Sequence, residues 1–269
     1  MPTAEVNGAR LYYEWHGPES GPVLVLNNGI LMNAASSWLP QRAALSDACR
    51  LLLYDCRGQG MSSHPDGPYS MAGHADDLAG LLEALSVPSA HIAGISYGGE
   101  VGQAFALAYP NRVRSLFLAD TVSEVGPELR LIVEGWRAAA ERADPELFFL
   151  VTAPWNFSPG FIAAERALLD AARLRYRELD YPAIVRLCDA FLTSVAFTAR
   201  LREIAVPTRI VVGGADLLKG PAYASILHRH IRGSDLQTIP GAGHAVNWER
   251  PDAFNARLQE FVLSLDPRR

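Results

Sequence analysis

A serine between two glycines stands where an apolar run gives way to a helical pattern. The run His91–Ile95 leads directly into Gly94-Ile95-Ser96-Tyr97-Gly98. This Gly-x-Ser-x-Gly spacing is typical of a sharp strand-to-helix turn that exposes a serine hydroxyl at a helix N-terminus, where the helix dipole favours developing negative charge. Small residues at 94 and 98 let neighbouring backbone pass close. The pattern predicts a nucleophile at Ser96. The alternative interpretation is a glycine-rich strand-to-helix connection without a catalytic role.

A serine hydroxyl is a poor nucleophile until a base takes its proton. The chain has seven histidines, and six of them fall in turns, on helical patterns or at the start of a strand. His244 differs, because Gly241-Ala-Gly-His244 follows the last apolar run and precedes the last helical pattern. Loops at the carboxyl ends of parallel strands are where α/β active sites gather their groups. His244 is therefore the predicted base.

The imidazole needs a carboxylate that orients it and stabilises its charged form. Asp216 and Asp120 both end apolar runs at the required edge of the sheet, and both satisfy the chain order Ser, Asp, His. Asp216 is favoured because the small residues Gly213-Gly214-Ala215 let the strand end turn sharply. Asp120 stays an alternative acid, and for each aspartate the other reading is a cap of the next turn or helix.

The elements that must position these groups follow an alternating pattern of short apolar runs and longer helical stretches. Strands that are apolar on both faces and separated by helices predict parallel βαβ units, and the segment Ala4–Trp15 alternates around Asn7-Gly8, which predicts an antiparallel hairpin. We expect an α/β fold with a mostly parallel, doubly wound sheet of about eight strands. The six apolar runs are Val23–Leu26, Leu51–Tyr54, His91–Ile95, Leu116–Ala119, Arg209–Val212 and Leu236–Ile239. The helical stretches are Met71–Leu85, Val101–Tyr109, Pro221–Ile231 and Pro251–Leu265.

The region between Asp120 and Pro207 breaks this rhythm, because it contains helical patterns and many aromatic residues but no strand run. It is too long for a connection. We therefore predict a core domain of residues 1–121 and 205–269, with a helical cap of residues 122–204 inserted after the sixth strand. The aromatic residues fit either a lid over a site or the interior of a plain helical subdomain.

Composition excludes several classes of protein. With 49% hydrophobic residues in 269, the chain is not disordered, and its net charge of −5 with almost no lysine argues against nucleic acid or an anionic membrane as a partner. The segment Met1–Gly17 lacks the features of a signal peptide, and no run of about 18 apolar residues occurs. The three scattered cysteines predict buried thiols rather than a metal or disulfide framework. A cytoplasmic protein that acts on a small molecule is expected.

Several further motifs match one known family. Asp55-Cys-Arg57-Gly58-Gln-Gly60-Met-Ser62 looks like its Asp-x-Arg-Gly-x-Gly-x-Ser turn, and Asp76-Asp77-Leu78 looks like its helix motif before the serine. With these motifs the chain resembles the α/β-hydrolase superfamily over essentially its whole length, in the esterase and lactonase part. The resemblance implies that Ser96 is the nucleophile, Asp216 the acid after the seventh strand and His244 the base. It also implies that residues 122–204 roof the substrate pocket.

The oxyanion-binding loop departs from the family pattern. Where the family commonly has His-Gly after the first parallel strand, this chain has Asn27-Asn28-Gly29-Ile30. A tetrahedral oxyanion needs about two preorganised N–H donors, and by position these are the backbone N–H groups of Ile30 and Tyr97. Backbone donors survive a change of side chain, so Asn28 is expected to support the loop as the histidine would. Enol-lactonases of aromatic-acid catabolism resemble this chain in having an Asn at this place.

The resemblance implies a serine hydrolase, of the carboxylic ester hydrolase type, that cleaves small esters or lactones through an acyl-enzyme without a cofactor or metal. A serine at the turn argues against haloalkane dehalogenase and epoxide hydrolase chemistry, which needs a carboxylate there. Enol-lactone hydrolysis, C–C bond hydrolysis and perhydrolysis use the same triad and remain alternatives. A ligand-binding receptor of the same fold with little turnover is an alternative from another class, and turnover of a simple aryl ester distinguishes it from an enzyme.

Overall fold

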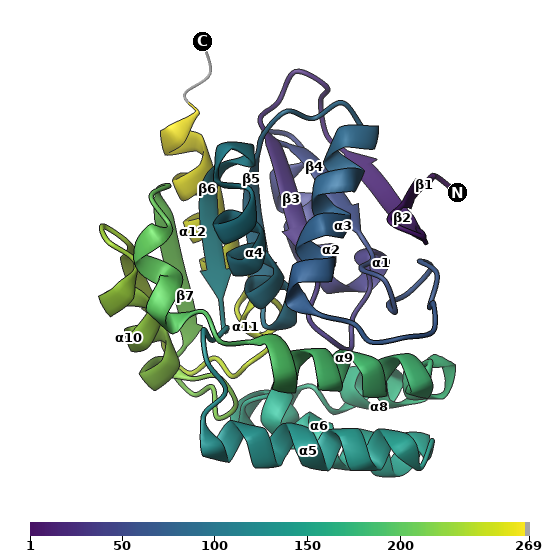
Figure 1. The fold of residues 1–269 in the computed structure, drawn as a ribbon. Coiled ribbons are helices and arrows are strands. Elements are labelled where there is room, and N and C mark those ends of the chain that lie inside the picture. Colours follow the sequence, from purple (N-terminus) through teal and green to yellow (C-terminus); the bar gives the residue numbers. More distant parts are fainter. Residues whose placement is uncertain (267–269) are drawn as a thin grey trace.

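One sheet of eight strands forms the centre of the protein (Figure 1). The computed structural model describes residues 1–266 of the chain. The strand order is β1-β2-β4-β3-β5-β6-β7-β8. Neighbouring strands are parallel from β4 across to β8, whereas β1 pairs antiparallel with β2 and β2 pairs antiparallel with β4. The expected α/β sheet is therefore confirmed. The strands are β1 (Thr3–Val6), β2 (Ala9–His16), β3 (Val23–Asn27), β4 (Arg50–Tyr54), β5 (Ala90–Ile95), β6 (Val113–Ala119), β7 (Thr208–Gly213) and β8 (Asp235–Ile239).

The hairpin at the N-terminus is the one that the sequence predicts. Val6 of β1 pairs with Ala9 of β2, which leaves Asn7 and Gly8 as a two-residue turn. Both turn residues have positive φ, 48° and 74°, as the turn type that matches the right-handed twist of paired strands requires. Local turn chemistry is sufficient to specify this element.

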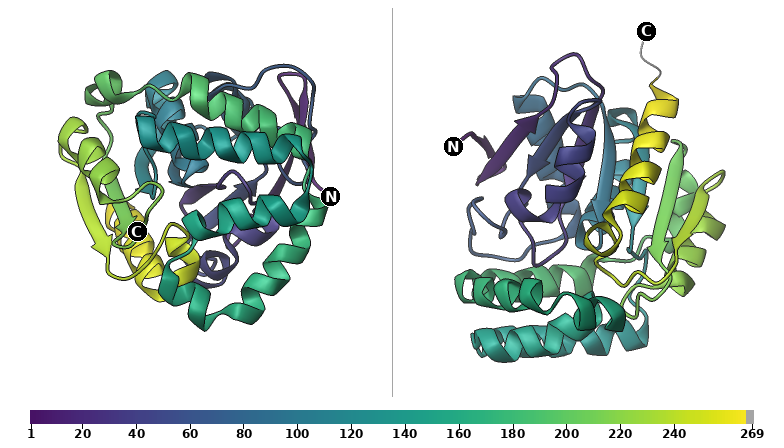
Figure 2. Two further views of the ribbon diagram at one scale, coloured as in Figure 1. Left: turned by 90° about the horizontal axis from the view of Figure 1, so that it is seen from below. Right: turned by 180° about the vertical axis from the view of Figure 1, so that it is seen from behind.

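Helices cover both faces of the sheet. Helices α3, α4 and α10 lie on one face, and α12 packs with α2 on the other (Figures 1 and 2). No helix within residues 1–266 is long and apolar enough to cross a membrane. The helices are α1 (Ala34–Ser37), α2 (Leu39–Leu45), α3 (Met71–Ala84), α4 (Tyr97–Ala108), α5 (Pro127–Glu141), α6 (Pro145–Asn156), α7 (Pro159–Ala164), α8 (Arg166–Arg175), α9 (Tyr181–Ser194), α10 (Pro221–His230), α11 (Val246–Glu249) and α12 (Pro251–Leu265), with short 3₁₀ turns at Pro110–Arg112, Tyr176–Glu178 and Thr198–Glu203.

The doubly covered sheet explains the apolar runs. Successive side chains of a strand point to opposite faces, so Val25 joins the core that contains Phe105 of α4, whereas its neighbour Leu24 joins the core that contains Phe254 of α12. All four side chains are buried. Because both faces need apolar residues, the central strands do not alternate with polar ones.

Helix α4 begins at Tyr97, four residues earlier than the predicted start at Val101. Gly98 and Gly99 carry no side chain that could show the helical period, so the first turn is invisible in the apolar pattern. The structure explains why they are glycines, since a Cβ at Gly98 would lie 2.2 Å from the carbonyl oxygen of Asn27 in β3. Helices α1, α2 and α11 were not predicted either; each is seven residues or shorter, too short for a clear period.

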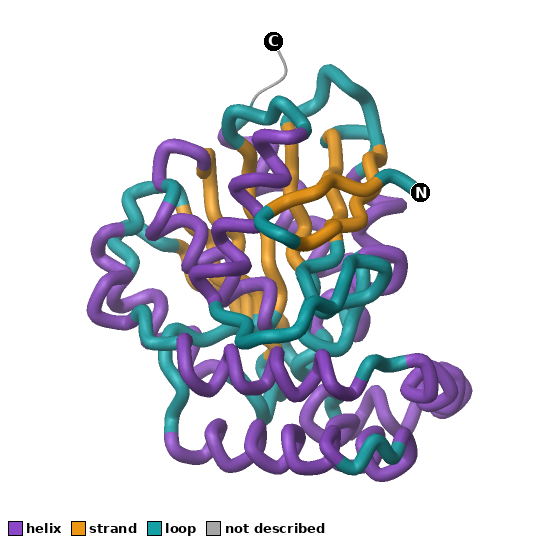
Figure 3. Tube along the Cα trace, turned by 45° about the vertical axis from the view of Figure 1, so that its right-hand side comes forward, coloured by secondary structure: helices purple, strands orange, loops and turns teal. Residues whose placement is uncertain are grey.

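Helices α5 to α9 form a separate layer across the end of the sheet at which β6 terminates (Figures 1 and 2). Figure 3 shows this layer as helices joined by loops, which agrees with the expected helical insertion after the sixth strand. The two ends of the insertion lie next to each other. Glu124 and Ala196 form an isolated antiparallel bridge, and Phe197 N–H donates to the carbonyl of Ser123 at 2.6 Å.

Candidate active site

Ser96 occupies the turn between β5 and α4 in a conformation that serine rarely adopts. Its φ is 53° and its ψ is −122°, and a non-glycine residue in such a region costs about 1–3 kcal/mol. The turn is held by backbone hydrogen bonds, because Ser96 N–H donates to the carbonyl of Ala119 at 2.9 Å and its own carbonyl accepts from Gly99 N–H at 2.8 Å. The surrounding sheet and helix therefore impose a strained backbone that presents the side chain of Ser96.

The glycines of this turn are needed for close packing. A Cβ on Gly94 would lie 2.1 Å from the carbonyl oxygen of Gly98, so the strand and the helix approach each other as the motif predicts. Gly99, to which the sequence analysis assigned no role, is equally constrained, since its Cβ would lie 2.5 Å from Cβ of Thr121 after β6. A larger residue at either position would force these neighbours apart.

Ser96, His244 and Asp216 form a continuous chain of hydrogen bonds. His244 Nε2 lies 2.9 Å from Ser96 Oγ, and His244 Nδ1 lies 2.9 Å from Asp216 Oδ2. All three residues are buried. They come from the turn after β5 and the loops after β7 and β8, which all lie at the carboxyl edge that these parallel strands share. The structure thus brings together the three residues that the sequence selects.

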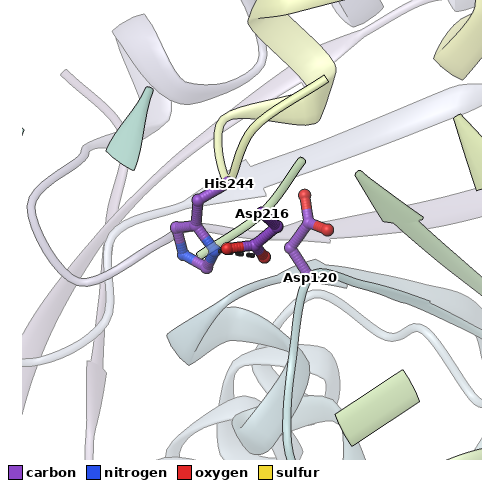
Figure 4. A group of neighbouring side chains, drawn as sticks. All are labelled: Asp120, Asp216 and His244. Atoms are coloured by element: carbon purple, nitrogen blue, oxygen red, sulfur yellow. Dashed lines mark hydrogen bonds and ion pairs between the residues drawn. The ribbon is translucent and has the colours of Figure 1, made fainter. Parts of the chain in front are cut away.

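Asp120 lies next to this chain but does not touch the imidazole. Figure 4 shows Asp216 between His244 and Asp120. Asp120 Oδ1 accepts from Gly213 N–H at 2.8 Å, and its Oδ2 has no hydrogen-bond partner among residues 1–266. Of the two aspartates left open by the sequence, Asp216 is therefore the one bonded to His244.

The two aspartates differ in how readily they ionise. Burial opposes ionisation of Asp216, but the neighbouring His244 and the N–H groups of Lys219 and Leu218, at 3.0 and 2.7 Å, bring its pKa below the usual value. Burial and the charge of Asp216 raise the pKa of Asp120 well above its usual value. Asp216, which is bonded to the imidazole, therefore ionises more readily than Asp120.

Asp120, Asp216 and His244 also offer possible metal ligand atoms within 4.8 Å of one another. Both ring nitrogens of His244 are already engaged, one by Asp216 and one by Ser96. A metal bound here would have to break one of these hydrogen bonds. The donor set therefore fits a hydrogen-bonded chain rather than a metal centre.

The loop after β3 carries the first predicted oxyanion donor, Ile30. The side-chain amide of Gln59 donates to the carbonyls of Gly29 at 3.0 Å and Ile30 at 3.3 Å. Asn28 donates to the carbonyl of Tyr54 at 2.8 Å, and so supports the loop as expected. The second predicted donor belongs to Tyr97, the first residue of α4, whose N–H has no partner inside the helix.

The two motifs at residues 55–62 and 76–78, which resemble those of the family, support the structure around this loop. The carboxylate of Asp55, buried and with its pKa raised by that burial to about 6, accepts from the backbone N–H of Ala34 at 2.6 Å and of Met61 at 2.8 Å. Arg57 binds Asp77 of α3, with Nη2 2.6 Å from Oδ1. These residues thus have a structural role that connects β4 and α3 to the serine side of the site.

A cavity of about 390 Å³ opens above Ser96 and His244. The helical layer supplies most of its far wall, including Phe149 of α6 and Phe161 of α7. Phe161 stacks on Phe157 with ring centroids 5.3 Å apart. Other aromatic residues of the layer, such as Phe148, are buried in its interior. The aromatic residues therefore serve both of the roles that the sequence left open.

Two charged residues near the site were not predicted from the sequence. Glu100 of α4 and Lys219 after β7 form an ion pair at 2.9 Å, and both are buried. Glu100 also accepts from Val122 N–H at 3.0 Å. Lys219 is the only lysine of the chain. That rarity is the only feature of the sequence that could have drawn attention to it. The pair connects the helix after Ser96 to the loop that carries Asp216.

His74 occupies a different environment from His244. It is buried on α3, with Nε2 2.8 Å from the hydroxyl of Tyr97 and with no partner for Nδ1 among the described residues. Burial, together with the positive charge of Arg57, lowers its pKa from 6.5 to about 3. His74 therefore stays neutral in the folded protein.

We expect this burial to make the protein less stable in acid. Between pH 6.5 and about 3, the unfolded chain binds a proton at position 74 that the folded chain does not bind, so stability falls as the pH falls, by up to about 1.4 kcal/mol per pH unit. His74→Gln removes this contribution. Urea unfolding at about pH 6, 5 and 4 should give a steeper loss of unfolding free energy for the wild type than for the variant, and equal slopes would contradict the assignment.

Comparison with known proteins extends these observations. A model described as the alpha/beta hydrolase family matches residues 16–257. The chain is 31% identical over 268 residues to RutD of Azorhizobium caulinodans, a protein named for carbamate hydrolysis, covering 99% of this chain and 100% of that one. It is 29% identical to 3-oxoadipate enol-lactonase 2 of Acinetobacter baylyi, over 97% and 96% of the two chains. The crystal structure of an enol-lactonase from Burkholderia xenovorans superposes with a TM-score of 0.90 at 30% identity, over 97% and 99% of the chains.

Proposed function

Because the chain belongs to the alpha/beta hydrolase family, we propose that it is a serine hydrolase that cleaves small carboxylic esters or lactones through an acyl-enzyme intermediate. The observation that carries this proposal is the hydrogen-bonded chain Ser96–His244–Asp216 at the base of the roofed cavity. A hydroxyl, an imidazole and an ionised carboxylate in this order are the parts needed for nucleophilic acyl transfer.

In the proposed reaction Ser96 Oγ attacks the carbonyl carbon while His244 Nε2 takes the hydroxyl proton. Asp216 holds the ring through Nδ1 and stabilises the imidazolium that forms. The same proton then passes to the leaving oxygen, which frees the alcohol and leaves the acyl group on Ser96. Water, deprotonated by His244, releases the acid and restores the serine.

The backbone N–H groups of Ile30 and Tyr97 are the proposed donors to the oxyanion. Two features support this role: Gln59 binds the carbonyls beside Ile30, and Tyr97 opens a helix whose dipole favours negative charge. Removing one such donor typically costs a factor of about 10²–10³ in kcat. The helical layer of residues 122–204 is proposed as the cap that excludes bulk water from this position.

Enol-lactone hydrolysis is the second candidate, because two relatives that match nearly the whole chain are named enol-lactonases. Carbamate hydrolysis is a third, on the similarity to RutD. All three reactions use the same attack on a carbonyl carbon. The proposals therefore differ in the leaving group and in the shape of the cavity rather than in the triad.

The proposal is tested with a panel of aryl esters, saturated lactones, enol-lactones and carbamates, each assayed with the wild type. We expect turnover of at least one short-chain ester or lactone, and mass spectrometry of the quenched enzyme should find the acyl group on the peptide that contains Ser96. Binding of the panel compounds without any turnover would favour a receptor. Turnover without labelling of that peptide would contradict the acyl-enzyme.

A further inference from the structure

Ser96 lines two cavities of very different size. The large one has a volume of about 390 Å³ and the small one a volume of about 10 Å³. Ser96 and Ile30 line both cavities. A carbonyl carbon bonded to Ser96 Oγ therefore has room for one substituent in each.

The position of His244 distinguishes the two sides. His244 must protonate the leaving oxygen, so that oxygen has to lie within reach of Nε2. Within the described part of the chain, His244 lines the large cavity and not the small one. The leaving group consequently lies in the large cavity, and the other substituent of the carbonyl, the acyl chain, is directed towards the small one.

We propose that the small cavity is the acyl-binding subsite, and that it selects esters of a short acyl group carrying a neutral hydrogen-bond acceptor, such as a hydroxyl oxygen, next to the carbonyl. This inference rests on the proposed serine hydrolase function and defines its substrate class. The alcohol part of the substrate, in contrast, is free to be large.

The size of the small cavity limits the acyl chain. A volume of 10 Å³ is about what one water molecule needs, so one or two atoms beyond the carbonyl carbon fill it. The wall is made by buried side chains, among them Val133 of α5 and Phe191 of α9. Interiors are close-packed and yield little, so each further methylene has to displace this wall.

Two side chains with polar groups that line the cavity, Trp136 and Lys219, define the second requirement. Trp136 lines it and is 4% exposed, yet its Nε1–H has no acceptor among residues 1–266. A buried donor left unpaired costs about 1–3 kcal/mol, and we infer that this N–H binds an acceptor on the acyl group. Lys219 also lines the cavity, but Nζ lies 2.9 and 3.1 Å from the two oxygens of Glu100. Because Glu100 already neutralises Lys219, a neutral acceptor fits better than a second carboxylate.

Chain-length selectivity tests the size of the subsite. Each variant is assayed with p-nitrophenyl acetate, propionate, butyrate and hexanoate, which share one leaving group. For the wild type we expect kcat/KM to fall about tenfold or more from propionate to butyrate, since one methylene in a tight pocket is worth about a factor of 10. Val133→Ala enlarges the cavity and should reduce this fall to about twofold.

The matched control is Leu129→Ala, one turn earlier on α5, which removes a buried side chain that lines neither cavity. It should retain the wild-type fall. A flat chain-length profile in the wild type, or the same change in both variants, would overturn the size argument.

The acceptor is tested with a pair of equal size, p-nitrophenyl glycolate and propionate, in which a hydroxyl replaces a methyl group. Trp136→Phe keeps an aromatic ring but removes the N–H donor. The ratio of kcat/KM, glycolate to propionate, should fall about fivefold, as expected for one neutral hydrogen bond. Comparing ratios cancels the intrinsic reactivity of the two esters.

Trp155→Phe is the control, because Trp155 lies on α6 of the same layer and lines neither cavity. Its ratio should equal that of the wild type, and an unchanged ratio in Trp136→Phe would overturn the assignment of the donor. Failure of the proposed function is a separate result, since it would appear as turnover that persists when Ser96 is replaced, whatever the acyl group.

Discussion

Replacing Ser96 by alanine is expected to lower kcat for the best ester substrate by about 10⁶, because loss of a serine nucleophile removes the contribution of the whole triad at once. His244 and Asp216 remain in place, but they have no hydroxyl to activate. The change removes a single oxygen and no apolar contact, so the fold should survive. Steady-state rates measure the loss, and a thermal unfolding midpoint within a few degrees of the wild type verifies the fold.

Ser123→Ala is a matched control for this variant. Ser123 is also buried, and its hydroxyl is hydrogen-bonded to Thr198 at 2.7 Å, but it lines neither cavity. Its kcat should remain within a few-fold of the wild type. If Ser96→Ala retains a rate near that of the control, Ser96 is not the nucleophile.

The second large effect is expected at the carboxylate. Asp216→Asn should lower kcat by about 10⁴, the cost of the equivalent change in serine proteases, because an amide can hold the imidazole in the wrong tautomer and cannot stabilise its positive charge. The backbone N–H groups of Leu218 and Lys219, which now donate to Oδ1, can still donate to the amide oxygen, although more weakly than to a carboxylate. The side chain therefore stays in position, and the loss reports on charge and tautomer rather than on misfolding.

Asp120→Asn provides the contrast, with an expected loss of about tenfold or less. The raised pKa of Asp120 favours its protonated form, which an amide resembles, and the amide oxygen can still accept from Gly213 N–H. Both variants are assayed on one ester under the same conditions. If Asp120→Asn loses most of its kcat and Asp216→Asn retains it, the acid of the triad is Asp120, after β6.

The sheet and the turn that carries Ser96 could be predicted because their signals are local. Apolar runs, the Asn7-Gly8 turn and the Gly-x-Ser-x-Gly spacing each occupy a few consecutive residues. His244 was identifiable for the same reason, since it follows a recognisable strand. Helix α4 was placed too late because the reason for its glycines is contact with β3 and with Thr121, which the order of residues along the chain does not display.

Several other contacts between distant segments could not be predicted. Asp120 and Asp216 both end strands; the small residues before Asp216 favoured it, but the position of His244 in space is what shows that Asp216 is bonded to the imidazole. The pairing of Lys219 with Glu100 spans 119 residues. The small cavity needs Trp136 of the helical layer to lie beside Ser96. Periodicity predicts which face of a helix is apolar, but not which helix faces which loop.

The bridge between Glu124 and Ala196 has a consequence for how such a protein can diversify. The chain leaves the sheet and returns to it at one place, so the segment between these two residues is a side branch with adjacent ends. Segments of this kind can be lengthened, shortened or exchanged without rethreading the parent fold. Recombination between related genes at these two points would place a different helical layer over an unchanged triad. Substrate choice could then change in a single genetic event.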